Sequence, residues 1–197
     1  MVLGVTGNIA SGKSRVAARL GELGAAVVSA DQLAREAVAP GTSCLAEIVR
    51  CFGPGILGPD GRLDRQKLGA LVFGDTEARR RLEEITHPAI AQLAEERLAG
   101  LRASHALVVY EAPLLFEAGA EGRVDRILLV TADERVRLKR LMARDGLDRR
   151  AALQRIRAQM PQEAKVARAD YVIDNSGDWD SCRRQVDSLW RQLTGAS

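Results

Sequence analysis

Residues 7–14 read Gly7-Asn8-Ile9-Ala10-Ser11-Gly12-Lys13-Ser14, and they are the strongest indication of the fold in this sequence. It matches the pattern G-x-x-x-x-G-K-[ST], in which a glycine-rich loop joins a strand to a helix and surrounds phosphate groups with backbone N–H. The flanking sequence fits: residues 2–6 form an apolar run, and apolar residues recur at helical spacing after Ser14. The sequence therefore predicts a nucleotide-phosphate site at this loop.

Each part of the loop has an expected role. The helix that follows it presents a partial positive charge to an anion. Lys13 is expected to reach the β- and γ-phosphates, and the Ser14 hydroxyl to hold Mg²⁺. Asn8 tolerates a left-handed backbone, whereas Ala10 is expected to have a negative φ because its Cβ disfavours that region. The alternative is a glycine-rich turn that binds nothing.

Composition and charge narrow the class of protein. A chain of 197 residues with 46% hydrophobic residues suits one domain over 1–197 with a sizeable core. A net charge of +3 fits anionic small molecules and is too small and mixed for a nucleic-acid-binding module. We find no metal-ligand spacing of cysteines, no signal peptide and no membrane-spanning run. We expect a cytoplasmic protein, without a nucleic-acid or membrane partner, that is a monomer or small homo-oligomer.

Apolar runs separated by helical patterns predict an α/β fold with a five-stranded parallel sheet and helices on both faces. In such sheets ligands gather at the carboxyl ends of the strands, so the residues that follow each strand are candidates for a site. The five predicted strands are Val2–Thr6, Ala25–Ser29, Ala106–Tyr110, Arg126–Thr131 and Tyr171–Asp174.

Two long helical stretches interrupt this alternation. Residues 31–100 are too many for a simple crossover and are interpreted as a helical substrate-binding insertion. Asp64 and Asp75 are expected N-caps there, and His87-Pro88 predicts a kink or break in a helix of about 77–98. Residues 134–165 are rich in arginine and are interpreted as a helical lid.

Several residues carry a chemical and a structural interpretation. Asp31 follows the second strand, either as a catalytic base or as an N-cap. Arg140 and Arg144 share one helix face, either as lid cations on a transferring phosphoryl group or as a solvated surface. His87 has either a catalytic or a purely structural role.

The segments after the third and last strands are also ambiguous. Pro113-Leu114-Leu115-Phe116-Glu117 forms either a core-packing turn or part of the active rim. Glu111 could act on Mg²⁺ through water. Asn175 lies in a turn that could contact adenine or ribose.

Assembled, these residues resemble the dephospho-coenzyme A kinase family nearly end to end. The matching segments are residues 5–14, Ser29-Ala30-Asp31 with Ala34-Arg35, 61–65, 85–88, 113–117, the Arg140/Arg144 pair, Gln159-Met160, Lys165, 169–171 and 174–177. The resemblance implies a P-loop kinase of the nucleoside-monophosphate-kinase type. It also implies transfer of the ATP γ-phosphoryl group to the ribose 3′-hydroxyl of dephospho-coenzyme A.

The resemblance implies residue roles. Asp31, Lys13, Arg140 and Arg144 are the implied catalytic residues, and Ser14 the implied Mg²⁺ ligand. ATP is expected on Gly7, Asn8, Ile9, Ala10, Ser11, Gly12, Lys13, Ser14, Arg15 and Asn175. Dephospho-coenzyme A is expected on Asp31, His87, Pro113, Leu114, Leu115 and Glu117.

The chain departs from the family pattern at four positions. Asn8 and Ala10 replace usual glycines, Arg15 a usual threonine, and Ser29 a usual aspartate, which is expected to be dispensable because Asp31 remains. Two alternatives stay open: another kinase of this architecture acting on a nucleoside, nucleotide or shikimate-like alcohol, and a regulatory nucleotide switch. No [NT]-K-x-D base-reading motif supports a guanine switch.

Overall fold

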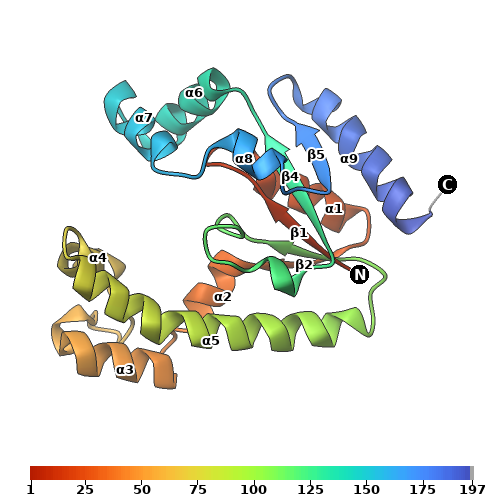
Figure 1. Ribbon diagram of the computed structural model, residues 1–197. Coiled ribbons are helices and arrows are strands. Elements are labelled where there is room, and N and C mark those ends of the chain that lie inside the picture. The colour runs from red at the N-terminus through yellow and green to blue at the C-terminus, as the bar shows by residue number, and fades with distance from the viewer. Residues whose placement is uncertain (196–197) are drawn as a thin grey trace. The chain divides into compact units, whose positions relative to one another are not determined.

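The structure is a computed structural model that describes residues 1–195. Within them, five strands form one parallel sheet of order β2-β3-β1-β4-β5 (Figure 1). All five residues of the central strand β1 are buried, as expected for a parallel sheet covered on both faces. The five-stranded parallel sheet is therefore confirmed, although two strands begin slightly later than predicted. The strands are β1 Val2–Thr6, β2 Ala26–Ser29, β3 Val108–Glu111, β4 Arg126–Thr131 and β5 Tyr171–Asp174.

Helices connect and surround these strands. They are α1 Lys13–Glu22, α2 Ala30–Glu36, α3 Ser43–Phe52, α4 Arg65–Val72, α5 Thr76–Arg102, α6 Glu134–Asp145, α7 Arg149–Arg157, α8 Gln162–Val166 and α9 Trp179–Thr194, with short 3₁₀ helices η1 Pro54–Ile56 and η2 Glu121–Arg123. Among residues 1–195, none of these helices combines the length and apolar character that a bilayer crossing needs.

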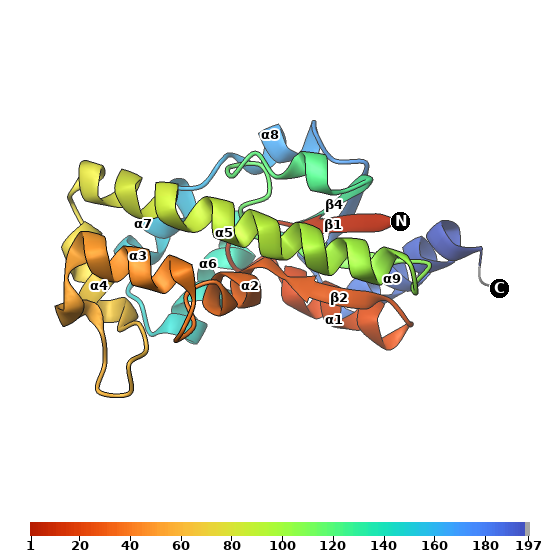
Figure 2. The same cartoon turned by 90° about the horizontal axis from the view of Figure 1, so that it is seen from below.

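The chain divides into two compact units. The first comprises residues 1–29 and the chain from Leu98 onward, and contains the sheet. In it α1 packs against β2 and β3 and against α9 (Figure 2). Apolar side chains of α1 and α9 join those of β1, β3 and β4 in one core, because each helix has an apolar stripe at helical spacing. This packing holds the start of α1 against the carboxyl end of β1.

The second unit is residues 30–97 and is helical. Its core is formed by side chains of α3, α4 and α5, including Cys44, Ile48 and Leu68. The predicted N-caps are both present: the Asp64 carboxylate accepts from Gln66 N and Lys67 N at 3.0 Å, and Asp75 accepts from Ala78 N at 2.9 Å.

Of the kink or break predicted at His87-Pro88, the break is wrong, since α5 runs from Thr76 to Arg102 with Pro88 inside it. The kink stays a prediction. Proline removes one N–H from the helix and its ring crowds the carbonyl group four residues earlier, so the surrounding packing must compensate for it. Leu82, Ile85 and Ala89 pack on the core on either side of it, so tertiary packing continues the helix through this position.

Candidate active site

The phosphate loop leaves the first turn of α1 open to a ligand. Gly12 is the N-cap of α1 with φ 95°, and no side chain caps the helix. The first N–H groups of such a helix have no partner within the helix and carry its positive end. A Cβ on Gly12 would lie 2.2 Å from Asn175 Nδ2, and one on Gly7 2.4 Å from the Val130 carbonyl oxygen. Both glycines of the motif are therefore required by the space around them.

The expectation that Ala10 has a negative φ is wrong, because its φ is 62°. The loop needs a left-handed residue at this point, and a non-glycine residue there is strained. Ala10 and Ile9 pack against an apolar cluster between α6 and α7. This packing offsets the backbone strain that the sequence alone did not predict.

Ser14 and Glu111 meet at the edge of the loop. The Ser14 hydroxyl donates to Glu111 Oε1 at 2.5 Å. Glu111 ends β3, where it is in register with Val5 of β1 and Ser29 of β2. Within residues 1–195 there is no group of three His, Cys, Asp or Glu side chains that would hold a metal. The oxygen pair suits Mg²⁺, which takes few protein ligands and completes its shell with water and phosphate.

The side chain of the buried Asn175 contacts the backbone of the phosphate loop. Its side-chain Nδ2 donates to the Ser11 carbonyl oxygen at 2.7 Å, and its backbone N donates to Thr131 O at 2.9 Å. The amide is thus directed at the loop backbone. Its predicted contact with ATP stays a prediction. Arg15, at the other end of the loop, lies with its guanidinium carbon 3.9 Å from the centre of the Trp179 ring.

The two predicted lid arginines differ in their surroundings. Arg140 Nη2 donates to the Asn175 carbonyl oxygen at 2.9 Å, and the buried Arg140 Nη1 has no hydrogen-bond partner within residues 1–195. Arg144 Nε instead donates to Asp145 Oδ1 at 2.7 Å, a contact that raises the pKa of Arg144. Arg140 therefore lies against Asn175, the residue that contacts the loop backbone, whereas Arg144 is paired with the Asp145 carboxylate.

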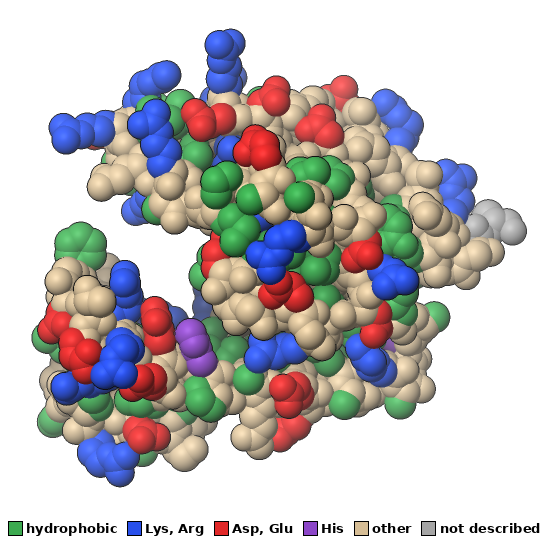
Figure 3. Space-filling model, viewed as in Figure 1, with side chains coloured by type: hydrophobic (Ala, Val, Ile, Leu, Met, Phe, Trp, Pro, Cys, Tyr) green, Lys and Arg blue, Asp and Glu red, His purple; other side chains and the backbone are tan. Residues whose placement is uncertain are grey.

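Other basic side chains cover α6 and α7. Figure 3 shows Lys and Arg side chains projecting from the surface over these two helices. On α7, a hollow of about 510 Å³ is lined by Arg149, Arg150 and Arg157. Buried Arg137 also lies on α6, where burial lowers its pKa and its Nε donates to the Ala132 carbonyl oxygen.

The segment after β3 is partly core and partly exposed. Leu115 and Phe116 are buried, whereas Leu114 is exposed. The Pro113 carbonyl oxygen accepts from the Thr6 hydroxyl at 3.4 Å. Glu117 Oε1 lies 2.7 Å from Nζ of the fully buried Lys165, as an ion pair. The core-packing interpretation therefore holds for Leu115, while the predicted substrate contacts of the segment remain predictions.

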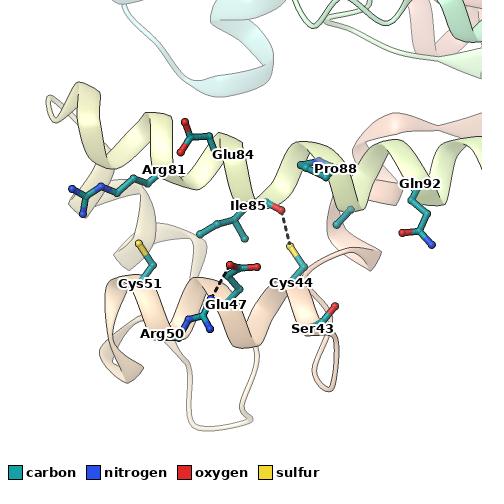
Figure 4. Close-up of a pocket in the computed structure, with 11 residues that line it drawn as sticks. Ser43, Cys44, Glu47, Arg50, Cys51, Arg81, Glu84, Ile85, Pro88 and Gln92 are labelled. Carbon is teal, nitrogen blue, oxygen red and sulfur yellow. Dashed lines mark hydrogen bonds and ion pairs between the residues drawn. The ribbon is translucent and has the colours of Figure 1, made fainter.

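In the helical unit, Asp31 lies exposed in the first turn of α2, the second residue after β2. Because α2 begins at Ala30, Asp31 lies inside the helix and is not its N-cap, so the N-cap alternative is wrong. His87 is exposed on α5. A hollow of about 630 Å³ lies between α3 and α5, where Cys44 and Glu47 of α3 and Ile85 of α5 point toward one another (Figure 4). The predicted role of His87 stays a prediction.

Sequence reasoning assigned no site role to Gln159. Its side-chain Oε1 accepts from Ile9 N at 2.6 Å, and Asn8 Nδ2 donates to the Met160 carbonyl oxygen at 2.9 Å. These contacts join residues separated by about 150 positions, so no local pattern predicts them.

A phosphate loop between the central strand and first helix of a five-stranded parallel sheet, with arginine-rich helices beside it, defines a P-loop kinase. A shikimate kinase from Bacteroides thetaiotaomicron shares the fold, with a TM-score of 0.54 at 14% identity over 100% of this chain and 99% of that one. More specifically, the family model for dephospho-CoA kinase matches residues 1–181. The chain belongs to the dephospho-CoA kinase family, as its sequence motifs predict.

Individual relatives agree with the family match. A Geobacter sulfurreducens dephospho-CoA kinase is 55% identical over 190 residues, covering 96% of both chains. One from Syntrophotalea carbinolica is 54% identical, covering 98% of this chain and 92% of the relative. The solved dephospho-CoA kinase from Campylobacter jejuni superimposes with a TM-score of 0.76 at 31% identity, over 98% of this chain and 97% of that one.

Proposed function

We propose that this kinase transfers the γ-phosphoryl group of ATP to the ribose 3′-hydroxyl of dephospho-coenzyme A, giving coenzyme A. Family membership over residues 1–181 supports the choice of substrates. The observation that carries the chemistry is the open N-terminus of α1 beside the Ser14–Glu111 contact. Residues 31–100 would bind the acceptor and 134–165 would form the lid. We place the reaction in the cytoplasm.

The donor side of the reaction uses the loop. The N–H groups of the first turn of α1 would hold the phosphate oxygens, and Lys13, the first residue of α1, would neutralise charge on the β- and γ-phosphates. Ser14 and Glu111 would hold Mg²⁺, directly or through water. When bound, the ion would supply further neutralisation of the phosphate oxygens.

The acceptor side uses Asp31. An exposed aspartate that caps nothing is free to accept the proton of an attacking hydroxyl. Its position along the chain supports this role, since Ser29, two residues earlier, is in register with Glu111. The attacking oxygen forms the new P–O bond as the bond to the β-phosphate oxygen breaks, and the hydroxyl proton passes to Asp31.

The transferring group also needs a cation. Arg140 has one guanidinium nitrogen on Asn175 and a second buried nitrogen without a partner in residues 1–195. Such a donor is costly to leave unpaired, and a phosphoryl oxygen would satisfy it. A second cation, Arg144, would join after leaving Asp145. Closure of the lid would exclude water and suppress hydrolysis of ATP.

The test is ADP release from ATP with Mg²⁺, with and without dephospho-coenzyme A, followed by mass analysis of the acceptor. We expect acceptor-dependent release and one added phosphate on the acceptor. The Lys13→Ala variant should be inactive and remain folded by circular dichroism. Release of ADP at the same rate without acceptor, or wild-type turnover in Lys13→Ala, would refute the proposal.

A further inference from the structure

Two hydrogen bonds attach the phosphate loop to the segment that follows α7. Asn8 Nδ2 donates to Met160 O at 2.9 Å, and Ile9 N donates to Gln159 Oε1 at 2.6 Å. The loop donates in both bonds, once from a side chain to a backbone oxygen and once from the backbone to a side-chain oxygen. Together they fix both the position and the orientation of the loop relative to residues 159–160.

An apolar contact adds to these bonds. Ile9 and Ala10 are partly buried against a cluster of Leu138, Leu141, Ala152 and Ile156, which belong to α6 and α7. Ile9 and the two residues that replace usual glycines, at positions 8 and 10, therefore all contact this part of the unit through their side chains. A glycine at either position would have no side chain for these contacts.

The surroundings of Asn8 indicate a purpose beyond folding stability. The residue is 2% exposed, and its Oδ1 has no hydrogen-bond partner within residues 1–195. An unsatisfied buried oxygen is unfavourable. The Nδ2 of the same amide bonds to the Met160 oxygen and holds the loop. Asn8 therefore lowers the stability of the fold through Oδ1 while it positions the loop through Nδ2.

We propose that Asn8 and Gln159 are positioning residues that hold the phosphate loop in its ATP-binding conformation and attach it to the α6–α7 helices. The inference rests on the proposed binding of ATP by this loop. A loop whose N–H groups are already arranged loses less conformational freedom when phosphate binds. The loop also packs on α6 through Ile9 and Ala10, beside Leu138 and Leu141, and Arg140 lies between these two leucines in the sequence.

The test compares two glutamines in the same unit. Gln159→Leu removes the acceptor for Ile9 N. Gln162→Leu is the matched control, because Gln162 Oε1 accepts from Ala132 N at 3.2 Å and does not contact the loop. Titration calorimetry with ATP and Mg²⁺ gives Kd. Hydrogen exchange of the peptide covering residues 7–14, without nucleotide, reports loop order independently of activity.

We expect Gln159→Leu to raise the Kd for ATP about 3- to 10-fold, the range for one lost hydrogen bond, with faster exchange confined to the loop. Gln162→Leu should change neither. Equal Kd values for the two variants, or unchanged loop exchange in Gln159→Leu, would overturn the inference.

Should Gln159→Leu speed exchange throughout the sheet, Asn8→Ala decides the question, because it removes only the bond to the Met160 oxygen. A raised Kd with local exchange supports the attachment, and a wild-type Kd overturns it. A wild-type protein that binds no ATP would instead refute the proposed function.

Discussion

The hydroxyl of Ser14 donates a 2.5 Å hydrogen bond to the carboxylate of Glu111, across 97 positions of sequence. The sheet produces this contact, since β3 lies beside β1 and Glu111 is in register with Val5, just before the phosphate loop. One oxygen comes from the loop helix and the other from the neighbouring strand. A hard divalent cation prefers ligands of this kind.

The first prediction concerns metal dependence. Glu111→Gln should raise the Mg²⁺ concentration needed for half-maximal activity about tenfold, because a neutral amide attracts the cation less strongly. Activity is measured against Mg²⁺ at fixed ATP. Glu134→Gln, in the exposed first turn of α6, is the control and should leave the curve unchanged. If the curves of activity against Mg²⁺ concentration overlap for Glu111→Gln and wild type, Glu111 is not part of the metal site.

Much of the fold could be predicted because its signals are local. The strands β1, β4 and β5 begin and end at the predicted residues, since each is a short and mainly apolar run. The loop between β1 and α1 follows from its motif, and the Asp64 and Asp75 caps follow from their position before helical patterns.

The remainder depends on tertiary contacts that no local pattern contains. Ala10 takes a positive φ because the loop requires it and a distant apolar cluster packs on it. α5 continues through Pro88 because the helical unit packs along it. Arg140 and Arg144 look equivalent by spacing, yet only Arg140 contacts Asn175. The predicted roles of the site residues therefore need experiments.

The second prediction distinguishes a steric clash of a new Cβ in the phosphate loop from the strain of a positive φ at a non-glycine residue. Gly12→Ala should abolish ATP binding, because its Cβ would lie 2.2 Å from Asn175 Nδ2 at a φ of 95°. Gly146→Ala is the matched control: Gly146 has φ 65° and nothing within 4 Å of a Cβ. It should only lower thermal stability, by about 1 kcal/mol, and keep the wild-type Kd. Binding by Gly12→Ala at wild-type affinity would contradict the close contact.

The third prediction tests the base. Asp31→Asn should lower kcat by about 100-fold or more, because the amide cannot accept the acceptor's proton, while the Kd for ATP changes little. Asp60→Asn alters another exposed aspartate of the helical unit and should retain wild-type kcat. Single-turnover rates distinguish chemistry from product release. If the rate of Asp31→Asn stays within twofold of wild type, Asp31 is not the base.

The fourth prediction ranks the two lid arginines. Arg140→Ala should lower kcat more than Arg144→Ala, since Arg140 already lies against Asn175 with an unpaired buried nitrogen. Removing a cation from the transferring phosphoryl group is expected to cost about 10³-fold in kcat. The Asp145→Asn variant tests the role of Arg144 in a second way, because it weakens the ion pair that Arg144 makes with Asp145 in this structure. A wild-type kcat in Arg140→Ala would show that Arg140 has a structural role only and does not act on the transferring phosphoryl group.

The last prediction is a pH dependence of stability at the start of α4. The backbone N–H of Lys67, with that of Gln66, lowers the pKa of Asp64 below its ordinary value of 3.8. The charged cap therefore stabilises the fold at pH values above 3.8, and this contribution is lost as the pH falls through the lowered pKa. The Tm difference between wild type and Asp64→Ala should be largest near pH 7 and shrink toward pH 2. Asp64→Asn keeps a capping oxygen without a charge, so its Tm difference from Asp64→Ala should change much less over that range. A wild-type advantage over Asp64→Ala that grows on acidification would have the wrong sign and would rule out the charged cap as its source.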